Sequence, residues 1–277
     1  MLSRMKSSLG LAFAGILFAT VSLAVVPAIW AQEPDQDDTA LQVIAAINGG
    51  MAAFKNGQYA DAAASFSIAT RLAPGSALAH LYLGTAYAAE AAHNPMTPEN
   101  KQIALSALEE FDAVLKLRPD NLSAMKQAAS LDRSIQRYDD ALGLDKKVVE
   151  IDPGDVEAIY SIGYLDWQKA NMVANRILAE DGLTDDGLGN VKLLHVPCMK
   201  LRAENSALVN DGIANLKRAI ELKPDNADAM QYLQLMYRRR ADLACGERSA
   251  LNADLKLADE WKQKAAAARK PAGAESR

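Results

Sequence analysis

Few residues in this chain have the types and spacing that catalytic or metal chemistry requires. The 277 residues include three histidines, His80, His93 and His195, and no two of them lie at metal-ligand spacing. The two cysteines do not form a C-x-x-C pair, and no G-x-S-x-G, Walker or G-x-G-x-x-G motif occurs. Adjacent acids such as Asp139 and Asp140 point about 100° apart on a helix, so they do not make a catalytic pair. The sequence therefore predicts no enzyme, no catalytic residue, no cofactor and no metal site.

One group of side chains has the chemistry of a binding surface. Tyr160, Tyr164 and Trp167 are spaced i, i+4 and i+7, which puts all three on one face of a helix. Aromatic side chains, together with arginine, dominate the binding energy of protein interfaces. The question is then which elements hold this stripe and whether they leave it open to a partner.

The composition favours closely packed helices. Half of the residues are hydrophobic, only 6% are aromatic, and no stretch of alternating β-branched residues occurs. The formal net charge is −5, and it becomes −7 without residues 1–31, which contain two basic residues and no acidic one. An acidic chain without a dense basic stripe is a poor nucleic-acid binder, so we expect no nucleic-acid partner.

Four prolines divide the chain into similar units. The motifs RLAP, KLRPDN, EIDPGD and ELKPDN contain Pro74, Pro119, Pro153 and Pro224, and each would end a helix, because proline gives no N–H. The third follows the second by 34 residues, and the other two intervals exceed 34 by 11 and 37 residues. Residues 122–153 can be read as two short helices with small residues where they cross. A 34-residue helix-turn-helix unit of this kind resembles the tetratricopeptide repeat (TPR).

The resemblance implies an all-α, right-handed TPR-like solenoid of about five helix-turn-helix repeats over residues 43–268, with insertions between the helices of repeats 2 and 4. The expected units are 43–76, 77–121, 122–155, 156–226 and an atypical last unit from Ala227, whose second helix is about 250–268. In the fourth unit we expect the first helix to run to about Glu180.

The resemblance also implies a scaffold for protein–protein interaction, whose first helices line a concave groove that binds a peptide or a helix. The residues at groove-facing positions of the TPR pattern are Lys126, Arg133, Tyr160, Tyr164, Trp167, Gln231 and Arg238. The set does not reproduce the TPR carboxylate clamp. The alternative is that the aromatic stripe packs against the insertion hairpin of residues 168–200. Two other functions remain open, a membrane-anchored assembly or tethering factor of an envelope complex and an accessory subunit of an exported enzyme.

The N-terminus has the pattern of a bacterial export signal. Arg4 and Lys6 precede a long uncharged run, and Ala31 offers a small residue at a cleavage point. We expect a signal peptide over 1–31, a flexible acidic lead-in over 32–42 and a disordered tail over 269–277, in a periplasmic or extracellular protein. The alternative is an uncleaved anchor over 9–31 in the inner membrane, because the run is long enough to span a bilayer.

The two cysteines lie near one edge of the expected stack. Cys198 comes just before the second helix of the fourth unit, and Cys245 just after the first helix of the fifth. In a TPR stack these two helix ends lie on the same edge, and an oxidising compartment permits a disulfide. Cys245 should lie opposite about residue 204, which is six residues, or roughly 9 Å along a helix, from Cys198. A disulfide needs its two Cα atoms within about 7 Å. The sequence is therefore compatible both with a disulfide between Cys198 and Cys245 and with two separate buried thiols.

Overall fold

The computed structural model describes residues 36–92 and 94–269, and these form ten α-helices with no strand among them. In chain order the helices are α1 Gln36–Lys55, α2 Tyr59–Leu72, α3 Ala77–Ala91, α4 Pro98–Leu117, α5 Leu122–Ser134, α6 Tyr138–Ile151, α7 Val156–Glu180, α8 His195–Leu222, α9 Ala227–Ala241 and α10 Arg248–Ala268.

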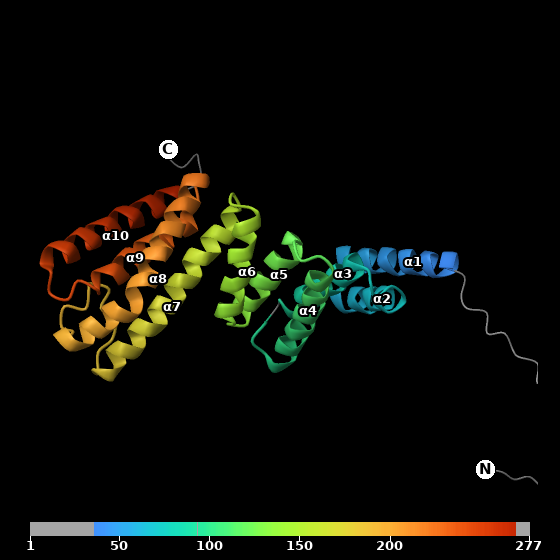
Figure 1. The fold of residues 1–277 in the computed structure, drawn as a ribbon, viewed down its shortest axis with the longest axis horizontal. Coiled ribbons are helices and arrows are strands. Elements are labelled where there is room, and N and C mark those ends of the chain that lie inside the picture. Colours follow the sequence, from blue (N-terminus) through green and yellow to red (C-terminus); the bar gives the residue numbers. More distant parts are fainter. Residues whose placement is uncertain (1–35, 93, 270–277) are drawn as a thin grey trace, which may run out of the picture.

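Consecutive helices pack in pairs, and each pair stacks on the next. The pairs are α1 with α2, α3 with α4, α5 with α6, α7 with α8, and α9 with α10. Figure 1 shows the result as an elongated arrangement, with α1 and α2 at one end and α9 and α10 at the other. The fold is a helical solenoid, as the repeat pattern predicts.

The closing prolines also set where the next helix begins. Two residues after each proline stands a side chain that caps the following helix, accepting a hydrogen bond from the N–H three residues on. These caps are Ser76, Asn121, Asp155 and Asn226. Thr97 caps α4 in the same way, with Pro98 in the first turn.

Three of the pairs place a glycine against a large buried side chain. A Cβ added at Gly84 would lie 2.8 Å from Cε1 of Phe111, and one at Gly163 would lie 2.6 Å from Cγ of Leu216. Gly50 approaches Phe66 equally closely. Only glycine permits this approach without displacing the partner. Phe66, Phe111 and Leu216 each lie eight residues before a closing proline, and in the pair α5–α6 that position is Asp145.

The N-terminal boundary differs from the sequence prediction. Residues 36–42 belong to α1 and are therefore not part of a flexible lead-in. Asp37 and Asp38 in the first turn favour a helix start, since carboxylates stabilise the positive end of the helix dipole. The predicted signal peptide 1–31 and residues 270–277 of the predicted tail lie outside the described residues. Within the described part of the chain, no helix has the length and apolar character needed to cross a membrane.

The longer insertion extends the fourth pair. Helix α7 runs to Glu180, where the sequence predicts its end, and α8 begins at His195, so residues 181–194 form the connecting loop. This loop packs at the end of the solenoid near the C-terminus of α9, where Arg238 donates to the carbonyl of Gly187.

Candidate functional site

Four aromatic rings gather where the first helices of the last two pairs meet. Tyr160, Tyr164 and Trp167 project from α7, and Tyr232 joins them from α9. The ring centroids of Tyr232 lie 4.9 Å from Tyr164, 5.1 Å from Trp167 and 6.2 Å from Tyr160. We call these four residues the aromatic cluster, and we call the side of the solenoid formed by α1, α3, α5, α7 and α9 the odd-helix face.

The cluster is half-buried, so it is neither core nor free surface. Burial raises the pKa of Tyr160 and of Tyr232. Gln168 donates a hydrogen bond of 2.6 Å to the hydroxyl of Tyr164. Aromatic pairs at these distances contribute about 0.5–1.5 kcal/mol each beyond burial. The rings therefore hold one another in place and still present apolar surface with polar hydroxyl groups.

The insertion loop lies elsewhere. The polar contacts of residues 181–194 go to the last turn of α9 and the residue after it. Arg239 pairs with Asp185, and Asn190 donates a 2.7 Å hydrogen bond to Asp242. The ring contacts of the stripe go to Tyr232 instead. The polar contacts of the loop thus lie at the end of α9, while Gln168, which belongs to the predicted hairpin 168–200, donates to the hydroxyl of Tyr164 within the stripe.

The basic residues assigned to the groove already have partners in the chain. Lys126 lies 2.9 Å from both Asp155 and Glu157, and these carboxylates raise the pKa of its ammonium.

Arg133 donates to the hydroxyl of Ser161 at 2.6 Å and to the carboxylate of Asp145 at 3.1 Å. Arg238 binds Gly187 and Asp259 at the end of α9. The structure thus brings the three α7 rings together, while these cations serve contacts between helices.

Sequence reasoning missed Tyr232 because it assigned the neighbouring Gln231 to the groove. Consecutive helical residues point about 100° apart, so an error of one position selects a different face. Gln231 is half-buried on α9, one position from the cluster residue. The aromatic side chain of Tyr232 could have indicated its role, since it is the one aromatic residue in the first half of α9.

The odd-helix face has further hollows, of which two differ clearly in chemistry. Between α1 and α3 lies an apolar cavity of about 160 Å³ lined by Met51, Phe54, Phe66 and Tyr82. A polar hollow between α5 and α7 is lined by Ser123, Lys126, Ser130 and Glu157. The face therefore changes character along the solenoid, from apolar near α1 through polar at α5 to aromatic at α7 and α9.

Cys198 and Cys245 are joined by a disulfide in the structure, with their Cα atoms 5.5 Å apart. Cys198 lies in the first turn of α8, because that helix begins at His195, and Cys245 lies in the turn between α9 and α10. Arg202 of α8 holds the same turn, since its guanidinium donates to the carbonyls of Leu243 and Ala244 at 2.6 and 2.9 Å. The bond therefore closes a loop of 47 residues at a site that is also fixed by hydrogen bonds.

The histidine that lies on a first helix has a structural role. His80 pairs through Nδ1 with Glu110 at 2.6 Å, and its Nε2 lies 3.0 Å from the carbonyl of Pro74. These contacts tie α3 to α4 and to the turn before α3. Among the residues that the structure describes, no group of three or more histidines, cysteines or acids is placed to hold a metal ion.

Comparison with known proteins agrees with this architecture. The model of the tetratricopeptide repeat family matches residues 47–93. The chain is 31% identical over 137 residues to the protein CTR9 homolog of Arabidopsis thaliana, a segment that covers 46% of this chain and only 12% of that protein.

Two solved structures share the fold across most of the chain. MamA (residues 41 to the end) of Desulfovibrio magneticus RS-1 superposes with a TM-score of 0.55 and 19% identity, covering 82% of this chain and 94% of that one. YrrB, described as a TPR protein with an unusual peptide-binding site, has a TM-score of 0.52 and 16% identity, covering 82% and 86%. The family model therefore finds a tetratricopeptide repeat at residues 47–93, and the solved structures share the helical solenoid fold over most of the chain.

Proposed function

We propose that this protein is a non-enzymatic scaffold that binds a peptide or a helix of a partner protein on its odd-helix face, at the aromatic cluster. The observation that carries the proposal is the half-buried cluster itself, which joins α7 to α9 on the odd-helix face. Tyrosine and tryptophan combine large apolar area with a polar group, which suits residues that anchor a partner. The peptide-binding site named for YrrB, which shares the fold, supports a peptide as the ligand class.

Site-specific photo-crosslinking tests this assignment directly. A photoreactive phenylalanine analogue in place of Tyr164 is expected to capture the partner in the native extract. The same analogue in place of Lys256, an exposed residue of the even-numbered helix α10, serves as the control. Capture at both positions, or at Lys256 alone, would remove the aromatic cluster from the proposal.

Alanine variants separate binding from stability. With the captured partner in hand, Tyr164→Ala and Trp167→Ala are expected to weaken its binding about tenfold or more, the range of interface hot spots. The helical melt should change little. A large loss of melting temperature in both variants would show that the rings are core residues instead.

We propose further that the protein is exported and that residues 1–31 are removed. The support is the pattern of Arg4, Lys6 and the uncharged run that ends at Ala31. Mass spectrometry of the native protein should find an N-terminus near Gln32. An intact Met1 in the membrane pellet would favour the anchored alternative.

A further inference from the structure

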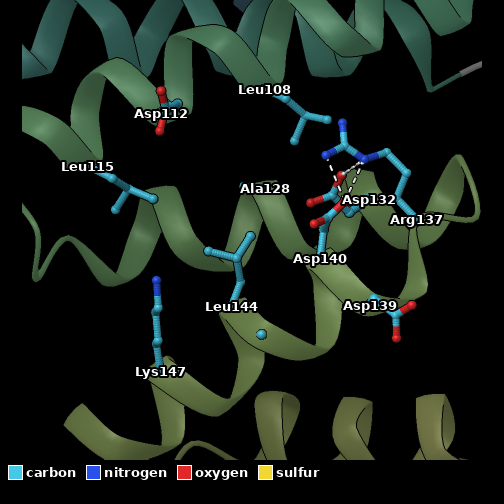
Figure 2. Close-up of a pocket in the computed structure, with 11 residues that line it drawn as sticks. Leu108, Asp112, Leu115, Ala128, Asp132, Arg137, Asp139, Asp140, Leu144 and Lys147 are labelled. Atoms are coloured by element: carbon cyan, nitrogen blue, oxygen red, sulfur yellow. Dashed lines mark hydrogen bonds and ion pairs between the residues drawn. The ribbon is translucent and has the colours of Figure 1, made fainter.

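Another cavity lies away from the aromatic cluster, between the even-numbered helices α4 and α6 with α5 behind them. Its volume is about 430 Å³. Figure 2 shows Asp132, Arg137 and Asp140 grouped at one end, Leu144 near the middle, and Leu115 toward the other end with Asp112 and Lys147. Four aspartates and two basic residues line it, so its walls have a net charge of −2. We call this space the α4–α6 cleft.

Asp132 is the buried charge of the cleft. Only 3% of its surface is exposed, and its Oδ1 atom makes no hydrogen bond within the described part of the chain. The nearest cation is Nε of Arg137 at 3.3 Å, but this guanidinium directs its hydrogen bonds to Asp140, at 2.7 and 2.8 Å. Burial raises the pKa of Asp132 to about 6, so the carboxyl group is mostly ionised at neutral pH and incompletely compensated. A buried charge in this condition gains from a further cation.

Gly143 is an exposed lining residue of the cleft. It lies within α6, and a Cβ built on it would meet nothing within 4 Å. A glycine inside a helix costs about 0.5–1 kcal/mol relative to alanine. At Gly84 and Gly163 the close approach of a partner helix explains that cost. At Gly143 no packing contact explains the cost of a glycine within the helix, and the residue borders the cleft.

We propose that the α4–α6 cleft binds an arginine side chain of a partner protein, with its aliphatic stem against Leu115 and Leu144 and its guanidinium at Asp132. The net negative charge of the walls disfavours an acidic ligand, and the leucine side chains favour a cation on a hydrocarbon stem. A guanidinium is weakly hydrated and donates in a planar fork, which suits a buried carboxylate better than an ammonium group does. This surface is distinct from the aromatic cluster, so the inference does not depend on the proposed function.

Fluorescence anisotropy with two synthetic peptides tests the proposal. The probe is a labelled helical peptide with one arginine between leucines, and its partner carries citrulline, the neutral isostere, at that position. The full mature chain is expected to bind the arginine peptide at least tenfold more tightly. Equal binding of the two peptides, or no binding of either at millimolar protein, would overturn the proposal.

Gly143→Met tests the location without weakening the fold. The new side chain fills the cleft and removes a helix-destabilising glycine, so binding should fall at least tenfold while the melting temperature holds or rises. Gly143→Ala is the matched control, which should gain stability and retain most of the binding. Unchanged binding in Gly143→Met would place the peptide elsewhere and overturn the assignment.

Asp132→Asn tests the charge. The isosteric amide should weaken binding of the arginine peptide about tenfold and leave binding of the citrulline peptide unchanged. Asp225→Asn removes an exposed charge from the turn before α9 and should have no effect. Equal losses in both variants would reduce the interaction to non-specific attraction. Loss of binding in Tyr164→Ala would assign the peptide to the aromatic cluster.

Discussion

The pairs α3–α4 and α5–α6 are neighbours with the same backbone plan and different interiors. In α3–α4 the crossing is apolar, since Phe111 is fully buried against Gly84. In α5–α6 the same repeat position holds Asp145, and the small residue sixteen positions earlier is Ala129, in place of glycine. Asp145 is also buried, with 2% of its surface exposed.

The acid in α5–α6 is satisfied by side chains from two other helices. Arg133 of α5 and Ser161 of α7 both donate to the carboxylate of Asp145. Burial nevertheless raises the pKa of Asp145. The same fold therefore tolerates a polar crossing when the next pair supplies a donor. The difference shows that a solenoid position can exchange packing within a pair for hydrogen bonds between pairs.

The largest effect is expected from Phe111→Ala. Removing a fully buried ring costs about 3–5 kcal/mol, because the cavity left behind collapses only in part. Hydrogen exchange measured by mass spectrometry should show the loss in α3 and α4. A loss below about 1 kcal/mol would mean that the apolar crossing does not stabilise this pair more than the polar one.

Asp145→Ala should cost less, about 1–3 kcal/mol, the penalty for leaving buried donors without an acceptor. The loss should extend to α7, because Ser161 is one of those donors. Asp112→Ala, a change at an exposed acid of α4, is the matched control and should stay within about 0.5 kcal/mol. Protection lost in α5 and α6 alone would contradict the link between pairs.

Asp166 offers a pH-dependent test of buried acids in the middle of the solenoid. Burial raises its pKa to about 7, against the lowering effect of Lys146 and Lys169 and with a contribution from Asp211. The folded protein therefore keeps this proton over a range in which the unfolded chain, with a pKa of about 3.9, releases it.

The stabilising effect of the Asp166 proton is full below about pH 4 and is lost as the pH rises through about 7. Asp166→Asn should match the unmodified protein near pH 4 and melt several degrees higher at pH 8. Melting curves at pH 4, 6 and 8 provide the measurement. A variant that melts lower at pH 8 would reverse the sign and show that the ionised form is the better-stabilised one.

The smallest effect is expected from Ala129→Gly. No aromatic ring needs the space at this crossing, so the change should only lose helix propensity and one methyl group, about 1 kcal/mol. Chemical denaturation can resolve a change of this size. An increase in stability would indicate that Asp145 is crowded by Ala129, as Phe111 would be by a side chain at position 84.

The spacing of the closing prolines was enough to predict the helical solenoid, and the turn-rich segment 181–190 that follows Glu180 predicted the end of α7. These features depend on local rules, since proline ends a helix and the polar residue two positions later caps the next one. The start of α1 was missed because acidic residues 37 and 38 suit both a flexible segment and a first helical turn.

The polar partners could not be predicted in the same way. Arg133 and Arg238 occupy groove positions in the repeat pattern, but Asp145 and Gly187 engage them in the folded chain. Gly187 belongs to an insertion for which the repeat offers no template. The three α7 rings were found because i, i+4 and i+7 spacing suffices to align them, whereas Tyr232 required knowledge of how α9 packs.

The disulfide between Cys198 and Cys245 has a mechanical consequence. Tension applied between α1 and α10 passes through the covalent bond and bypasses the 47-residue loop that it closes. At about 3.3–3.6 Å per extended residue, roughly 160 Å of chain cannot be drawn out while the bond is intact. A pulled molecule should therefore reach its full contour length only after reduction, with the hidden length located in α8 and α9.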